Sequence, residues 1–331
     1  MTTDEPVEAQ DIDPDDPVFQ FVAGVIEIIY GPPAAGETSA FDNPAALRAS
    51  VAALLAEHAA PPRDISMSVE EQAERLVAAA WDAGEEAPAL AVDALRLWPD
   101  CANAYTFLGI SAGDELSLAI PMFTLGVMAA HAHLGNEIFE REAGNFWTIE
   151  ETRPFMRALG ELARANRDAG ATDVALHHYQ ELLRLNHADD QGARFELLSI
   201  FLEEGNTGAA AAIIEAFRDE ESPAFAYGAA LLAFQLGGDS SEARAVLAHA
   251  LTAAPAVAPY LAGLTPLPSD DTGVYQMGGD DEALLFADLL LPAWQATPNA
   301  AGWLRTQGGP VPGAPPKPPA KEKRSGPRQL D

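Results

Sequence analysis

The sequence predicts an all-α solenoid of stacked helical hairpins, and a repeat period carries this prediction. Three helix-ending segments resemble one another: ALRLWPDCANAY at 94–105, LLRLNHADDQGA at 182–193 and ALTAAPAVAPY at 250–260. Their equivalent residues His187 and Pro255 lie 68 positions apart, which is twice 34. A period of 34 residues is typical of the tetratricopeptide repeat. The alternation of apolar and polar residues that marks an exposed β-strand does not occur.

The same period sets a register for the repeats. Pro99 lies 88 positions before His187, or 68 plus 20, which predicts a further repeat and a twenty-residue insertion. We expect about five repeats over residues 68–265, starting at 68, 102, 156, 190 and 224, with the insertion near 131–155. Small or apolar residues then recur where the two helices of a hairpin approach: Ala87, Ala91 and Ala94; Ala175, Tyr179 and Leu182; Ala209, Ile213 and Ala216; Ala243, Leu247 and Ala250.

Glycines mark the predicted turns within the hairpins. Gly84, Gly170, Gly205 and the Gly237-Gly238 pair fall where a first helix must end, and glycine accepts the left-handed backbone of a C-terminal cap. Pro121 is expected near the first turn of a second helix, where its missing N–H costs little. The second repeat is therefore predicted to be slightly irregular.

Segments on either side of the array are predicted to cap it. Residues 17–67 are expected to form two capping helices, the second starting at Asn43-Pro44. Residues 266–305 are expected to form a loop, a C-terminal capping helix that Pro292 ends or kinks, and a short turn around Trp303. The acidic residues 1–16 and the Pro/Lys-rich residues 306–331 are predicted to be disordered.

The charge balance narrows the classes of partner. The chain has 50 Asp+Glu against 19 Lys+Arg and a formal net charge of -31, which fits a salt-loving host and a GC-rich genome equally. Its field repels phosphate backbones and anionic lipids, so neither nucleic acid nor a membrane is an expected partner. All three lysines lie in the tail, which could fold onto the acidic body or offer PPKPP to a proline-reading domain.

The expected compartment is the cytoplasm. Cys101 is the only cysteine, so neither an intramolecular disulfide nor a cysteine-based zinc site is expected. The N-terminus lacks the pattern of a secretory signal. The best membrane candidate, VFQFVAGVIEIIY, contains Glu27 and is shorter than the roughly 20 residues needed to span a bilayer.

Several segments resemble a known family. PDCANAYTFLG, GNFWTIEETRPFMRA, HYQELLRLNHADDQGARF and GDDEALLFADLLLPAW together look like bacterial tetratricopeptide repeat proteins related to the suppression-of-tumorigenicity (number seven) family, over about residues 68–305. The resemblance implies a helical repeat fold and brings no enzymatic activity or catalytic residues. Eukaryotic relatives are membrane proteins, a localisation we do not expect here. Asn145 and Thr148 stand where the family pattern has histidine and glycine.

The stretch NFWTIEETRPFMR, residues 145–157, is predicted to be a structural joint that leads into a binding face. Phe146 and Trp147 are expected to pack the insertion onto the array. Pro154 is expected in the first turn of the next helix, with the preceding acids near its positive end. The alternative interpretation is a binding hot spot, because Trp and Arg dominate such sites.

Arginines are predicted to line the inner face of the array. With the third repeat starting at 156, the groove positions of its first helix carry Arg157, Arg164 and Arg167, with Arg153 one turn earlier. Arg194 takes a groove position in the fourth repeat. Such a cluster could bind an anionic protein or peptide partner through bidentate hydrogen bonds. Alternatively, these arginines neutralise the protein's own acids.

The resulting expectation is a non-enzymatic scaffold for protein–protein interaction without a cofactor or metal. An enzyme or metal-binding subunit that uses His131, His133 and the glutamates of 131–151 is the alternative. The two histidines lie on different sides of a helix, which disfavours one shared metal. No nucleotide-binding, hydrolase or metalloprotease motif occurs. An oligomerisation module is a third interpretation.

Overall fold

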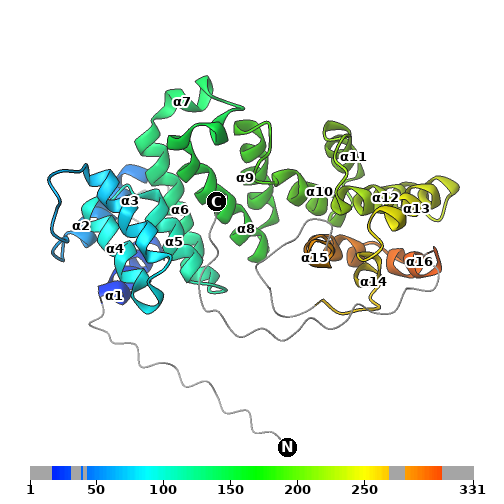
Figure 1. The fold of residues 1–331 in the computed structure, drawn as a ribbon, viewed down its shortest axis with the longest axis horizontal. Helices are drawn as coiled ribbons and strands as arrows, with labels where there is room; N and C mark the ends of the chain where they lie inside the picture. The colour runs from blue at the N-terminus through cyan, green and yellow to red at the C-terminus, as the bar shows by residue number, and fades with distance from the viewer. Residues whose placement is uncertain (1–16, 31–38, 40–42, 268–279, 308–331) are drawn as a thin grey trace, which may run out of the picture. The chain divides into compact units, whose positions relative to one another are not determined.

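The computed structural model describes residues 17–30, 39, 43–267 and 280–307, and this part of the chain forms α-helices and short 3-10 helices (Figure 1). The prediction of an all-α fold is confirmed for these residues, which form no β-strand. An isolated antiparallel bridge joins Asn145 to Asn186. The predictions for residues 1–16, most of the loop after residue 266 and most of the tail lie outside the described residues.

The chain divides into two compact units. Of the described residues, those up to 178 and those from 184 to 188 belong to the first unit, and 179–183 and those from 189 onward belong to the second. Helix α9 (Thr172–Leu185) contributes residues to both. The repeat spacing alone did not predict this division.

In the first unit, helices pair in hairpins. Helix α3 (Val69–Ala80) packs on α4 (Ala87–Leu97), and α5 (Ala102–Ser111) packs on α6 (Leu116–Leu134), while α8 (Arg153–Asp168) contacts both α5 and α6. The first helices begin at 69, 102 and 153, close to the predicted repeat starts. Ser68 and Glu71 form a reciprocal capping box at the start of α3, which satisfies two otherwise unpaired N–H groups.

Two further helices cover one side of these hairpins. Helices α1 (Pro17–Tyr30) and α2 (Pro44–Leu55) pack on each other, and each contacts α4 and α6. The predicted start of α2 is confirmed, because the Asn43 side chain accepts a hydrogen bond from the Ala46 N–H at 3.2 Å. One face of α1 is buried against the other helices and carries Phe21, Val25 and Ile29.

Helix α6 differs from expectation in its length. It begins at Leu116, so Pro121 is its sixth residue and not part of its first turn. The Ser117 carbonyl therefore lacks the N–H that another residue would supply at position 121. By length and composition α6 is the one helix of the described chain that could cross a membrane, with a mean hydropathy of 1.3, and 44% of that window is buried against protein.

The second unit contains the last two hairpins. Helix α10 (Ala193–Glu203) pairs with α11 (Thr207–Ala216), and α12 (Pro223–Gly237) pairs with α13 (Ser241–Ala253). The first helices begin at 193 and 223, against predicted repeat starts of 190 and 224. Side-chain caps from Asn206 and Ser240 start α11 and α13.

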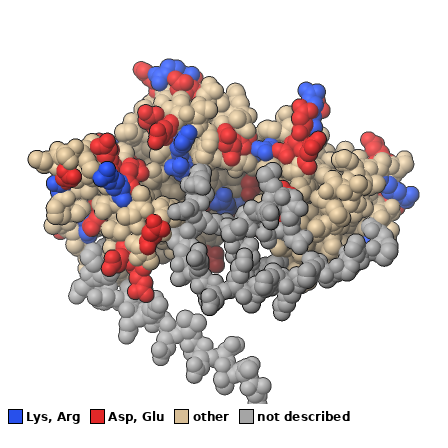
Figure 2. Space-filling view, viewed as in Figure 1, with Lys and Arg blue, Asp and Glu red and all other residues tan. Residues whose placement is uncertain are grey.

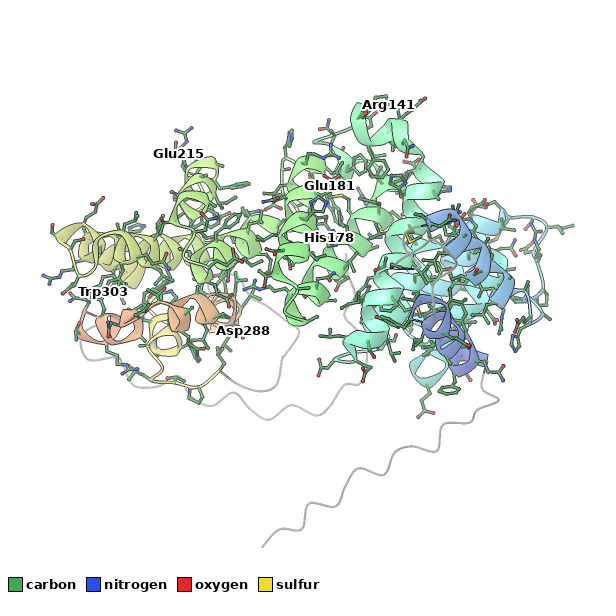
Figure 3. The ribbon with its side chains drawn as sticks, turned by 180° about the vertical axis from the view of Figure 1, so that it is seen from behind. Arg141, His178, Glu181, Glu215, Asp288 and Trp303 are labelled. Atoms are coloured by element: carbon green, nitrogen blue, oxygen red, sulfur yellow. The ribbon has the colours of Figure 1, made fainter. Side chains whose placement is uncertain are left out.

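The closing helices pack against the first helices of these hairpins. Helix α15 (Asp280–Ala296) contacts α10 and α12, and α14 (Ala258–Leu261) and α16 (Ala300–Gln307) pack beside it. The Ser199 hydroxyl donates to the Leu289 carbonyl at 2.6 Å. Trp303, labelled in Figure 3, stacks its ring on Phe234 with centroids 4.5 Å apart. This side of α10 and α12 is thus covered by the chain's own helix.

The small residues of the register are buried in most hairpins. Ala91, Ala175 and Ala243 are each 0% exposed. The fourth repeat differs, because Ala209 and Ile213 are only half-buried and Ala216 is exposed. Helix α11 fully buries Ala210 alone, so its neighbours in the register do not form a close helix contact.

Glycine turns close the hairpins as predicted. Gly170 has φ +77 and Gly205 has φ +68, the left-handed conformation that a side chain disfavours. After each, the next N–H returns to a carbonyl of the helix, from Ala171 to Asn166 at 2.8 Å and from Asn206 to Phe201 at 2.8 Å. The same chemistry therefore ends the first helix in two successive hairpins.

Candidate binding surface

Short elements connect the hairpins of the first unit to α8. Helix α7 (Asn136–Arg141), whose end is labelled by Arg141 in Figure 3, is followed by the 3-10 turns η3 (Phe146–Thr148) and η4 (Glu150–Thr152). The second turn runs directly into α8. Pro154 lies in the first turn of α8, where its missing N–H leaves no helical bond unmade.

Phe146 anchors these short elements. Its side chain is 0% exposed, and its ring lies against Phe139 of α7 and Phe155 of α8, with centroid distances of 5.0 and 6.2 Å. Phe139 and Phe155 also meet edge to face at 4.8 Å. Packed aromatic pairs stabilise by about 0.5–1.5 kcal/mol each beyond the area they bury. Phe146 therefore packs the first 3-10 turn against α7 and α8.

A buried hydroxyl joins the two 3-10 turns. Thr152 is 0% exposed, and its Oγ1 is hydrogen-bonded to the carbonyls of Phe146 and Ile149, the latter at 2.8 Å. Each carbonyl also accepts a backbone N–H, from Ile149 and from Thr152 respectively, so the hydroxyl adds a second, side-chain hydrogen bond to each turn. The buried Thr152 hydroxyl therefore fixes the backbone of the turn that carries Trp147.

Residues near the end of α9 hold the same turn from the other side. The His187 N–H donates to the Gly144 carbonyl at 3.0 Å, beside the bridge between Asn145 and Asn186. Gly144 has φ +93, and a Cβ there would lie 2.7 Å from the His187 ring. The position requires glycine for both its backbone conformation and its space.

Trp147 brings two arginines together. Its half-buried indole lies 5.9 Å from the guanidinium carbon of Arg153 and 5.9 Å from that of Arg157. The Arg153 Nε donates to the Trp147 carbonyl at 2.9 Å, so the turn fixes this guanidinium through its backbone as well. The ring face attracts both cations and offsets part of their mutual repulsion.

The positive charges of Arg153 and Arg157 are not balanced by an ion pair within the described chain. Burial lowers the pKa of Arg157, the neighbouring Arg153 lowers it further, and Glu74 acts in the opposite direction. The Arg157 Nε is buried without a hydrogen-bond partner, and neither arginine forms an ion pair within the described chain. Figure 2 shows acidic side chains scattered among fewer basic ones on the visible face. Two close cations without carboxylate partners are unusual in such a composition.

Glu74 and Asn103 complete this neighbourhood. Asn103 on α5 donates from Nδ2 to Glu74 Oε2 on α3 at 2.8 Å. The buried Cys101 thiol lies 3.8 Å from the other carboxylate oxygen, and burial followed by the charge of Glu74 raises its pKa well above the usual range. The charge of Glu74 also acts on Arg157 of α8. The first helices of three successive hairpins therefore contribute polar groups to one surface.

The remaining predicted residues of α8 differ in their partners. Arg164 is exposed and forms an ion pair with Glu161 one turn away at 2.6 Å. Arg167 is half-buried in the last turn of the helix. Exposed pairs at this spacing are worth only a few tenths of a kcal/mol.

Arg194 belongs to the second unit and is already neutralised there. It forms ion pairs with Asp189 at 2.8 Å and Glu220 at 2.7 Å, and its guanidinium lies over the rings of Phe195 and Phe217 at 4.1 and 5.6 Å. Burial raises the pKa of Asp189 despite the opposing hydrogen bonds from Arg194. With two carboxylates in place, Arg194 has the role that the self-neutralising interpretation predicted.

The histidines of the insertion pack against aromatic rings. His131 stacks on Phe139 with centroids 4.6 Å apart, and His133 meets Trp98 edge to face at 5.2 Å. Within the described ranges, no group of three or more His, Cys, Asp or Glu side chains is placed to hold a metal ion. The geometry thus offers nothing that favours the metal-binding alternative.

Comparisons with known proteins add no identity. No protein-family model matches the chain, and a search of curated proteins found no significant match. The site therefore has to be interpreted from its own chemistry.

Sequence reasoning missed Glu74 and Asn103 because they lie outside the groove positions weighed for α8. The signal was available, since Asn103 has the same place in its repeat as Arg157.

Proposed function

We propose that this chain is a non-enzymatic scaffold of the tetratricopeptide type that binds an anionic segment of a protein partner. The hairpin starts near the 34-residue register, the glycine turns and the buried alanines support this architecture. In such arrays the first helices of the hairpins line a concave groove. The resemblance to the suppression-of-tumorigenicity (number seven) family also favours a repeat scaffold.

The observation that carries the proposal is the arginine pair on Trp147. Seven other arginines in the described chain each form an ion pair with a nearby acid, namely Arg48, Arg96, Arg141, Arg164, Arg194, Arg218 and Arg244. Arg153 and Arg157 instead face one indole and each other. A carboxylate between them would remove their repulsion and accept charge-assisted hydrogen bonds.

The chemistry around the pair favours an isolated carboxylate over a polyanion. Glu74 is fixed by Asn103 and is electrostatically coupled to Arg157, so a second negative charge in the ligand would be repelled there. A peptide N–H or a side-chain donor of the ligand could instead donate a hydrogen bond to the Glu74 carboxylate. The second unit is a poorer location for the same ligand, because α15 covers α10 and α12.

The proposal is tested by titrating the protein with a labelled peptide that carries one glutamate, and with its glutamine twin. We expect the glutamate peptide to bind more tightly, and the Arg153→Gln/Arg157→Gln variant to weaken its binding about tenfold or more, since charge-assisted bonds are worth roughly 1.5–3 kcal/mol. Arg218→Gln is the matched control, because its ion pair is exposed and lies in the other unit. Equal binding of both peptides, or unchanged affinity in the double variant, would refute this function.

A further inference from the structure

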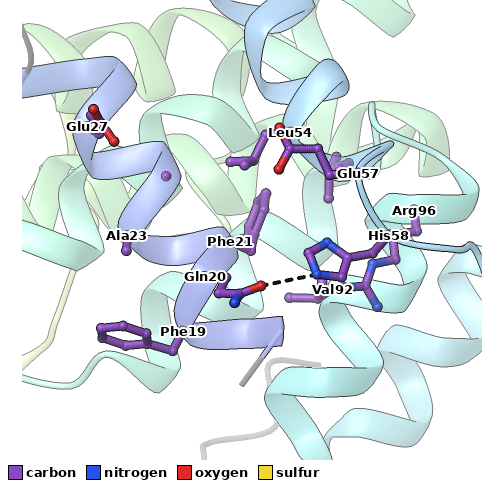
Figure 4. A pocket seen from close by; sticks show the side chains of 12 residues that line it. Phe19, Gln20, Phe21, Ala23, Glu27, Leu54, Glu57, His58, Val92 and Arg96 are labelled. Carbon is purple, nitrogen blue, oxygen red and sulfur yellow. Dashed lines mark hydrogen bonds between the residues drawn. The ribbon is translucent and has the colours of Figure 1, made fainter. Parts of the chain in front are cut away.

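A second candidate site lies in the first unit, apart from the arginine pair. A cavity of about 410 Å³ opens between α1, the residues that end α2 and one face of α4 (Figure 4). Its volume falls within the range of small-molecule sites, about 300–1,000 Å³. Phe21, Leu54 and Val92 supply apolar walls, and Phe19 at the opening is 40% exposed.

A half-buried arginine, Arg96, lines this cavity and makes one hydrogen bond to protein. The Arg96 side chain is 11% exposed, and its single hydrogen bond in the described chain joins Nη1 to Asp93 Oδ1 at 2.8 Å. Its Nε is buried without a partner. A guanidinium has five N–H donors, and leaving the buried Nε–H unsatisfied costs about 1–3 kcal/mol. An oxygen acceptor entering the cavity would relieve part of this cost.

Two carboxylates line the cavity as well. Glu27 comes from α1 and Glu57 from the residues after α2, and neither forms an ion pair within the described ranges. In the view of Figure 4 Glu27 lies across the Phe21 ring from Arg96, and Glu57 lies above the ring on the Arg96 side. His58 bridges to Gln20 at 3.1 Å, which ties the wall from α1 to the segment that carries Glu57.

We propose that this cavity binds a small zwitterion with an apolar body, the chemistry of a free apolar α-amino acid. The ammonium group pairs with Glu57, the carboxylate accepts from Arg96, and the side chain packs on Phe21 and Val92. A simple acid would meet two unneutralised carboxylates. A simple cation would leave the donors of Arg96 unsatisfied.

Calorimetric titration of the full chain with L-leucine and L-phenylalanine tests the proposal, with N-acetyl-L-leucine and L-leucinamide as probes that each lack one charge. We expect at least one free amino acid to bind, and both single-charge probes to bind about tenfold more weakly. Absence of binding by both amino acids at millimolar concentration overturns the proposal. Equal binding of the acetylated probe overturns the assignment of the ammonium site.

Variants locate the binding in this cavity. Ala23 is exposed on α1 and lines the cavity, so Ala23→Trp should fill the space without disturbing the core and abolish binding. Glu57→Gln should weaken binding about tenfold, whereas Glu85→Gln, an exposed acid elsewhere in the first unit, should not. Unchanged affinity in Ala23→Trp, or an equal loss in both glutamine variants, would contradict this location.

Discussion

Arg153 donates its Nε–H to the carbonyl of Trp147 and holds its guanidinium carbon 5.9 Å from the indole of the same residue. One residue of a 3-10 turn thus fixes a cation through both its backbone and its ring. Because Arg157 shares the ring at the same distance, Trp147 is the common support of the proposed anion site. Rigid support reduces the ordering cost that a ligand would otherwise bear.

Replacing Trp147 tests what its ring contributes to binding while the charges of Arg153 and Arg157 are kept. Trp147→Leu keeps both arginines but removes the ring face, so we expect binding of the glutamate peptide to weaken about fivefold to thirtyfold, in line with cation–π energies of about 1–2 kcal/mol. Trp147→Phe retains a ring face and should lose less. Fluorescence anisotropy with the labelled peptide measures both. Equal affinity in the leucine variant would show that the ring does not organise the pair.

The buried hydroxyl of Thr152 should matter for stability. Thr152→Val has nearly the same shape but removes the hydroxyl that bonds the carbonyls of Phe146 and Ile149, which we expect to lower the free energy of unfolding by about 0.5–1.5 kcal/mol. Thr148→Val is the control, because Thr148 is exposed and its partner carbonyl can bond water. Urea denaturation compares the two. A smaller loss for Thr152 than for Thr148 would contradict the proposed role.

Gly144 and Gly205 provide a matched pair of substitutions. Both have positive φ, but a Cβ on Gly144 would clash with the His187 ring, whereas a Cβ on Gly205 would meet nothing within 4 Å. Gly205→Ala should therefore cost about 1–2 kcal/mol from backbone strain alone, and Gly144→Ala more. Thermal denaturation of both variants checks the order. Equal melting temperatures would mean that the His187 ring yields freely.

Acid should weaken the contact between Arg194 and Glu220. Burial raises the pKa of Glu220, but hydrogen bonds from Arg194 and the Ser222 N–H outweigh it and leave the pKa below its usual 4.5. The folded state is thus stabilised above pH 4.5, and this contribution is lost as the pH falls through the lowered pKa. Glu220→Gln should destabilise the protein at pH 7 and differ less from wild type near pH 3.5.

Urea titrations at several pH values measure this difference. Glu221→Gln is the control, because the neighbouring Glu221 is exposed. Asp189 pairs with the same Arg194, so the comparison measures the change in the whole network of these two carboxylates and one guanidinium. A stability difference that grows as the pH falls would reverse the sign argued here.

Local sequence signals located the elements of the fold well. The 34-residue spacing placed the first helices, Asn43-Pro44 marked the start of α2, and Pro154 marked the first turn of α8. These signals depend on backbone chemistry within a few residues, so they can be read from a chain without its contacts. The start of α6 was not predicted, because Pro121 was expected near the first turn and the helix begins five residues before it, at Leu116.

The candidate site was predictable only in part. The joint at Phe146 and the arginines of α8 followed from residue type and register. Arg194 is left out of the proposed site, since its donors already bond Asp189 and Glu220, and these partners are 5 and 26 positions away. Glu74, Asn103 and the shared ring of Trp147 enter through contacts between hairpins. Pairings of that kind have no fixed spacing along a chain.

The sequence by itself determined the helical class, the repeat period, the hairpin turns and the acidic charge, because each depends on local backbone preference or on composition. The tertiary structure alone decided which arginines have acids beside them and which do not. That outcome depends on how separate helices pack, since an ion pair requires atoms within about 4 Å, whatever their distance in sequence. In this packing Arg194 forms ion pairs with two carboxylates, whereas Arg153 and Arg157 share one indole ring and lie beside each other.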